Sequence, residues 1–123
     1  MDRLKVYDLL LHHTHPVELS LFIKSLLRLK RREVSIVELR FYADPVSDFG
    51  FRIMKDQRYE PEMTAMIQRL IKAGDTFIDV GGNEGYFSVL ASKIAGDAGT
   101  VLCFEPQERL WQVIEKNFAI NQC

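Results

Sequence analysis

The sequence has little cysteine, no long apolar run and no excess of either charge. Its 123 residues include two cysteines, Cys103 and Cys123, which form no CxxC pair; such usage is typical of a reducing compartment such as the cytoplasm. Lysine and arginine total 16 against 17 acidic residues, a net charge of −1, so no overall field favours nucleic acid as a partner. The apolar runs are far shorter than the roughly 20 residues that span a bilayer. The start Met1-Asp2-Arg3 also lacks the apolar core of a signal peptide.

The composition limits the chain to one globular domain at most. Hydrophobic residues make up 47% and charged residues 27% of the sequence, which is typical of a globular protein. His12, His13 and His15 lie close together in the sequence, but no cysteine or acid at ligand spacing completes a metal-binding set. The sequence therefore predicts no metal site.

The first 33 residues contain no glycine and predict a helical segment over 1–33. We expect a short helix over 3–12 and, after Pro16, an amphipathic helix over 17–32. Four basic residues stand at the end of this second helix: Arg28, Lys30, Arg31 and Arg32. They would either complement the negative end of the helix dipole or contact an anionic membrane surface.

The pattern changes at Val34, where residues 34–123 predict an α/β unit. The β-branched run 34–41, the turn residues of 43–50 and the apolar run 51–55 predict a hairpin over 34–55 with a long turn. A helix is expected over 61–73, with Gly74 as its left-handed cap. The remaining segments predict βαβα over 76–120, with strands at 76–80 and 100–105 that are buried on both faces.

A glycine-rich loop follows the first of these two strands. In a βαβ unit, ligands bind where the strand passes through such a loop into the helix. Gly81, Gly82 and Gly85 allow a tight turn and the close approach of a ligand. Glu105 follows Gly85 by 20 positions, the approximate spacing of an acid that accepts hydrogen bonds from a ribose. The sequence therefore predicts an adenosine-bearing ligand.

Residues that the loop lacks narrow the choice of ligand. A dinucleotide fingerprint beginning at Gly81 would need glycine at the positions of Asn83 and Tyr86, and a P-loop would need a lysine after Gly85. Asp79, at the end of the strand, adds a negative charge that suits a cationic ligand better than a pyrophosphate. S-adenosylmethionine carries both a sulfonium and an ammonium group, so it is the cofactor that we expect.

The chain also resembles a known family. The motifs are Tyr-Glu-Pro at 59–61, Asp-Val-Gly-Gly-Asn-Glu-Gly-Tyr-Phe-Ser at 79–88 and Phe-Glu-Pro at 104–106, and together they resemble the FkbM-type S-adenosylmethionine-dependent methyltransferases. The resemblance covers about residues 34–123. It implies a Rossmann-like class I methyltransferase fold and methyl transfer to a hydroxyl oxygen, often on a sugar or another small molecule. It carries cofactor contacts over to Asp79, Gly81, Asn83, Gly85, Tyr86 and Glu105.

Two residues, Gly82 and Glu84, depart from the family pattern, and the role of Tyr86 stays open. Gly82 stands where alanine is usual, which we expect to be harmless to a tight loop. Glu84 stands where an apolar residue is usual. It would either add charge beside the methionine end of the cofactor pocket or, as we expect, point to solvent at the helix N-terminus. Tyr86 could contact the cofactor or pack the helix on the sheet.

The resemblance also implies that the fold is truncated after the second βα unit, because the family's acceptor site and catalytic residues would follow on later strands. No catalytic base is therefore named. Apolar sheet edges left uncovered would promote self-association. Two other functions stay open: a non-catalytic adenosine-binding or interaction module, and a nicotinamide-dependent oxidoreductase, against which the loop spacing argues.

Overall fold

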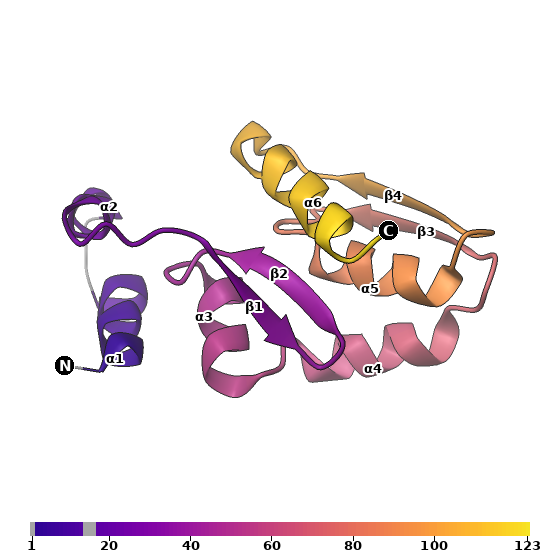
Figure 1. Ribbon diagram of the computed structural model, residues 1–123, viewed down its shortest axis with the longest axis horizontal. Helices are drawn as coiled ribbons and strands as arrows, with labels where there is room; N and C mark the ends of the chain where they lie inside the picture. Colours follow the sequence, from indigo (N-terminus) through magenta and orange to yellow (C-terminus); the bar gives the residue numbers. More distant parts are fainter. Residues whose placement is uncertain (1, 14–16) are drawn as a thin grey trace.

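The computed structural model describes residues 2–13 and 17–123 and has a mixed α/β architecture (Figure 1). Helix α1 (Arg3–Asp8) continues into a π-helical turn (Leu9–His13) and is followed by α2 (Val17–Leu26). Asp2 caps α1 by accepting a hydrogen bond from the Leu4 N–H at 3.2 Å. The predicted helix over 3–12 is confirmed, whereas His15 lies outside the described residues.

The predicted end of the second helix is wrong, because α2 ends at Leu26 rather than near residue 32. Arg28 adopts a left-handed conformation (φ 50°), and Arg32 already begins strand β1 (Arg32–Ile36). The basic residues therefore follow the helix instead of lying on it. They lie from the turn after α2 to the first residue of β1, along the connection that carries the chain from α2 toward the rest of the molecule (Figure 1).

The hairpin has a tight turn, so the prediction of a long-turn hairpin over 34–55 is wrong. Strand β1 pairs antiparallel with β2 (Leu39–Ala43), and the register places Ile36 opposite Leu39. Two residues, Val37 and Glu38, form the turn, with Val37 at φ 55°. A β-branched residue rarely adopts this conformation, so no local signal in the sequence indicates the turn.

Residues 51–55, predicted as the returning strand, belong to helix α3 (Asp48–Asp56). The Ser47 hydroxyl caps this helix by accepting a hydrogen bond from the Gly50 N–H at 2.9 Å. A Cβ on Gly50 would stand 1.9 Å from the Asp44 carbonyl oxygen, so this glycine permits close packing inside a helix. Phe49 and Ile53, four residues apart, point into the core.

The following elements match the predicted order. Helix α4 (Pro61–Leu70) is three residues shorter than predicted, and Gly74 (φ 86°) shapes the turn into the next strand rather than capping the helix. Strands β3 (Thr76–Val80) and β4 (Thr100–Phe104) pair in parallel, with helix α5 (Tyr86–Ala95) between them. Helix α6 (Glu108–Ile120) follows β4 and packs against β2.

The two small sheets are joined through the helices. The core contains buried residues from β1, β2, α3, α4 and α5, including Phe41, Phe49 and Val89. Asn117 of α6 and Asn121, the residue that caps its end, hydrogen-bond the backbone of β2: Asn121 accepts from the Arg40 N–H at 2.9 Å, and Asn117 accepts from the Tyr42 N–H at 2.7 Å. These two side chains, four residues apart, thus take the place of a further strand beside β2.

One face of the β3–β4 sheet is open, so the prediction that both strands are buried on both faces is wrong. Helix α5 contacts both strands. On the other face, the exposed side chains are Ile78, Val80, Leu102 and Phe104, and Val80 is 83% exposed. The predicted self-association has its clearest candidate surface here.

Across 2–13 and 17–123, no helix combines the length and apolar character needed to cross a membrane. Over the same residues, no three His, Cys, Asp or Glu side chains gather as a metal site would require.

The open sheet face gives a test of self-association. We expect Val80→Lys to shift the chain toward the monomer in concentration-dependent light scattering, because it places a charge in the apolar face. Val37→Lys is the matched control, since Val37 is equally apolar and 92% exposed at the hairpin turn. Equal molar masses for the parent chain and both variants at every concentration would contradict the prediction.

Candidate functional site

The glycine loop lies at the carboxyl ends of β3 and β4. Three of its residues have positive φ: Gly81 (85°), Asn83 (50°) and Gly85 (85°). The N–H groups of Gly81 and Gly82 both donate to the Phe104 carbonyl, at 2.7 and 3.0 Å. The left-handed conformations thus fold the loop back onto the end of β4, which brings residues from two strand ends together.

Glu105 holds this arrangement from the side of β4. One carboxylate oxygen, Oε2, accepts from the Asn83 N–H at 2.8 Å, and Oε1 accepts from the Gln107 N–H at 2.9 Å. The Trp111 indole N–H donates to the Glu105 carbonyl at 2.7 Å. The carboxylate is partly exposed, and each of its oxygens has a second lone pair. Glu105 can therefore accept hydrogen bonds from a ligand while it positions the loop.

Asp79 lies on the helix-covered face of β3. Its Oδ2 accepts a hydrogen bond from the Ser88 hydroxyl at 2.7 Å, which fixes the carboxylate against α5. Among the described residues, it is the one charged side chain that lines an apolar groove of about 370 Å³ between α4 and β3. The other lining residues are Met63, Met66, Ile67, Leu70, Ile71, Phe77 and Phe87.

A smaller cavity of about 150 Å³ lies directly beside the loop. Its lining residues are Phe49, Tyr59, Gly81, Gly82, Asn83, Glu84, Tyr86 and Phe87. Phe87 lines both this cavity and the apolar groove, so the two spaces adjoin. Within the part of the chain that the structure describes, no residue with a positive charge lines either space.

Tyr86 is part of an aromatic cluster behind the loop. It is 7% exposed, and its ring lies 5.2–5.7 Å from those of Phe41, Phe49, Tyr59 and Phe87. Burial, with smaller contributions from nearby carboxylates, raises the pKa of Tyr59. The ring of Tyr86 thus packs α5 on the hairpin and also contributes to the cavity wall.

Glu84 is buried, which corrects the expectation that it points to solvent. Its side chain is 2% exposed and forms an ion pair with Arg31, with Oε2 at 2.5 Å from a guanidinium nitrogen. Arg31 comes from the extended connection before β1 and also donates to the Tyr42 carbonyl at 3.4 Å. A buried carboxylate requires a partner of opposite charge, and here the partner lies 53 positions earlier in the chain.

Asn117 completes the support behind the loop. Its amide is fully buried: Nδ2 donates to the Glu84 carbonyl at 2.7 Å, and Oδ1 accepts from the Tyr42 N–H. Neither Asn117 nor Ser88 was predicted as a site residue. Asparagine and serine are common on helices, so only the fold reveals that these two hold the loop and Asp79.

Gly82 fits because its neighbour on β4 is a cysteine. A Cβ at this position would stand 2.3 Å from the Cys103 sulfur, so glycine fits here, whereas an alanine would require the cysteine to move. Burial is the main cause of the raised pKa of the Cys103 thiol, so the thiol favours its neutral form. Gly82 and Cys103 are therefore complementary in size.

This complementarity predicts that Gly82→Ala lowers the free energy of unfolding by about 1–3 kcal/mol, the usual effect of overpacking. Cys103→Ala in the same chain should recover most of the loss, because it removes the sulfur that the new methyl group meets. Cys103→Ser keeps an atom at that position and should recover less. Urea unfolding monitored by circular dichroism gives the free energies for the parent chain, for Gly82→Ala, and for each cysteine substitution alone and combined with Gly82→Ala. Additive effects would show that the contact is unimportant.

The buried ion pair predicts a second result. Arg31→Leu leaves the Glu84 carboxylate buried without its cation and should lower the free energy of unfolding by about 3–5 kcal/mol. The double variant Arg31→Leu/Glu84→Leu should be much closer to the parent chain. Arg52→Leu is the matched control: its partner Asp48 is half-exposed, so the expected loss is about 0–1 kcal/mol. Equal losses from the two arginine substitutions in urea unfolding would contradict the role given to Glu84.

Comparison of the chain with protein-family models, curated proteins and solved structures found no match. Its function is therefore argued from the residues and geometry of the site.

Proposed function

We propose that this chain binds S-adenosylmethionine and represents the cofactor-binding part of a methyltransferase with a Rossmann-like class I fold. The acceptor would be a hydroxyl of a sugar or another small molecule. One observation carries the proposal: the Glu105 carboxylate at the end of β4 lies against the glycine loop, with 2.8 Å from Oε2 to the Asn83 nitrogen. An acid in this place can accept both hydroxyl protons of a ribose.

The charges around the loop suit the sulfonium and ammonium groups of this cofactor. Acidic and aromatic side chains line part of the cavity beside the loop, and the charge of Glu84 is neutralised by Arg31. Asp79 and Glu105 remain as carboxylates near the loop, a field that favours a ligand with sulfonium and ammonium groups. The cavity of about 150 Å³ is smaller than the roughly 300–1,000 Å³ of ligand pockets. It would hold only part of the cofactor, with the remainder along the outer strand ends.

The loop amides favour this ligand over a dinucleotide. A pyrophosphate is normally held by backbone N–H groups that point outward from such a loop. Here the N–H groups of Gly81, Gly82 and Gly85 donate to backbone carbonyls, and that of Asn83 donates to Glu105. Four donors that a pyrophosphate would use are thus engaged within the protein, which argues against the oxidoreductase alternative.

When bound, S-adenosylmethionine supplies a methyl group on a positively charged sulfur, which leaves as a neutral thioether when an oxygen attacks the methyl carbon. The roles we propose for this chain are binding and orientation. Glu105 would fix the ribose, and the loop backbone would permit close approach. None of these residues is assigned as the base that takes the acceptor's proton.

Isothermal titration calorimetry of the folded chain tests the proposal. We expect saturable binding of S-adenosylmethionine and no binding of NAD. Glu105→Gln should weaken binding by about tenfold or more, since hydrogen bonds to a charged acceptor contribute about 1.5–3 kcal/mol. Glu108→Gln is the matched control, because it removes the same charge from an exposed position three residues away.

Circular dichroism of Glu105→Gln and Glu108→Gln verifies that each variant is folded. Binding of NAD in preference to S-adenosylmethionine, or no binding of either by the folded parent chain, would refute the proposed function. Equal affinities for the parent chain and Glu105→Gln would refute the role of Glu105.

A further inference from the structure

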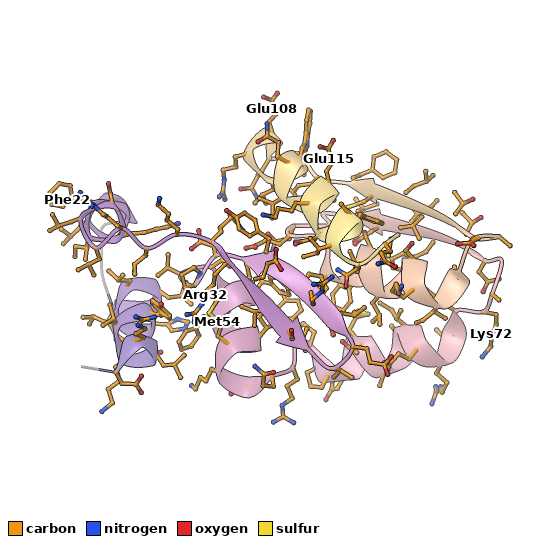
Figure 2. All side chains as sticks on the ribbon, viewed as in Figure 1. Phe22, Arg32, Met54, Lys72, Glu108 and Glu115 are labelled. Carbon is orange, nitrogen blue, oxygen red and sulfur yellow. The ribbon has the colours of Figure 1, made fainter. Side chains whose placement is uncertain are left out.

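The N-terminal helical part presents an apolar face that the rest of the described chain does not cover. Leu19, Phe22 and Leu26 recur at the spacing of one helix face on α2, and they are 45%, 65% and 70% exposed. Leu27, just beyond the helix, is 49% exposed. Figure 2 shows Phe22 at the outer end of the molecule, on α2 and remote from the β3–β4 sheet.

A basic hollow adjoins this apolar face. It has a volume of about 430 Å³ and is lined by Arg3, Arg28, Lys30 and Arg32 together with Val6, Tyr7, Leu27 and Leu29. Among the residues whose side chains the structure describes, no acidic one lines it. Leu27 belongs to both the hollow and the apolar surface, so the two form one continuous patch, which we call the basic–apolar patch.

The basic side chains of the hollow differ from the neighbouring Lys24 and Arg31 in their partners. Lys24 pairs with the buried Asp44, and Arg31 pairs with the buried Glu84. Within the described part of the chain, no salt bridge is formed by the four basic residues of the hollow. The Arg32 guanidinium instead lies over the Tyr7 ring, 5.8 Å from its centroid. Positive charge is therefore concentrated here although the whole chain carries a net charge of −1.

We propose that the basic–apolar patch docks this chain on an anionic membrane surface. Exposed leucine and phenylalanine beside lysine and arginine is the arrangement by which an amphipathic helix lies in a membrane interface. Phe22 and Leu26 would enter the boundary between headgroups and acyl chains. Arg28 and Lys30, with long aliphatic stems, would reach the lipid phosphates.

The alternatives explain less of the patch. A small phosphate in the hollow would account for the cations but not for the exposed face of α2. A second copy of the chain, related by a two-fold axis, would bring the four cations of each copy close to those of the other, which is unfavourable. An anionic lipid surface would contact both the cations of the hollow and the apolar face of α2. The patch shares no residue with the glycine loop, so this inference is independent of the proposed cofactor.

Flotation of the full chain with lipid vesicles tests the proposal. We expect the chain to float with vesicles that contain phosphatidylserine at low salt, much less at high salt, and little with pure phosphatidylcholine. Arg28→Gln/Lys30→Gln should weaken binding by about fivefold for each charge removed. Phe22→Ser should weaken it by about tenfold.

The chain offers matched controls for both changes. Arg58→Gln/Arg69→Gln removes two exposed charges elsewhere, and Met63→Ser removes an exposed apolar side chain from α4. Both should leave flotation unchanged. Because all the substituted side chains are exposed, circular dichroism should show parent-like folding throughout.

Four outcomes would overturn the proposal. The first is the absence of flotation with phosphatidylserine vesicles, and the second is equal flotation with both lipids. Release of the bound chain by millimolar inorganic phosphate at constant ionic strength would indicate a small-anion site instead. A dimer in light scattering that Phe22→Ser dissociates without lipid would indicate an interface between two copies.

Discussion

The buried side chain of Asn117 holds together parts of the chain that are far apart in sequence. Its amide donates to the loop carbonyl of Glu84 and accepts from the β2 N–H of Tyr42, so α6, β2 and the glycine loop meet at one fully buried group. The ion pair of Glu84 with Arg31 adds the connection before β1. In a low-dielectric interior such a network is stabilising only when every member is satisfied. The hairpin and the loop should therefore form and unfold together.

The glycine loop contacts the protein interior on one side and the end of β4 on the other. Glu84 pairs with Arg31 in the interior, whereas the N–H groups of Gly81, Gly82 and Asn83 donate to Phe104 and Glu105 at the end of β4. Glu105 receives one of them and remains partly exposed. The three acids near the loop thus have separate surroundings: one is neutralised by an arginine, one is bonded to Ser88, and one stands at the strand end. This division underlies the proposal of a ligand that is cationic and bears a ribose.

The sequence predicted the parts of the fold whose signals are local. Apolar strands, a glycine loop and helical periodicity placed β3, α5, β4 and α6 correctly along the chain, with Glu105 beside the loop. It failed where long-range contacts override local preference. Val37 adopts a left-handed conformation against its β-branched preference. Gly50, which suggested a turn, lies inside α3, where its lack of a Cβ permits close packing against the Asp44 carbonyl. Glu84 was misplaced because its partner, Arg31, is remote in sequence and had been assigned to a helix.

Amide chemical shifts show whether the loop and Glu105 together bind S-adenosylmethionine. In a ¹⁵N-labelled chain titrated with this cofactor, we expect saturable shifts at Asn83 and Gln107, whose N–H groups bond the Glu105 carboxylate. The amide of Gly74, in the turn before β3, should not move. Shifts confined to residues outside the loop and the end of β4, or no shift at saturating cofactor, would contradict the account.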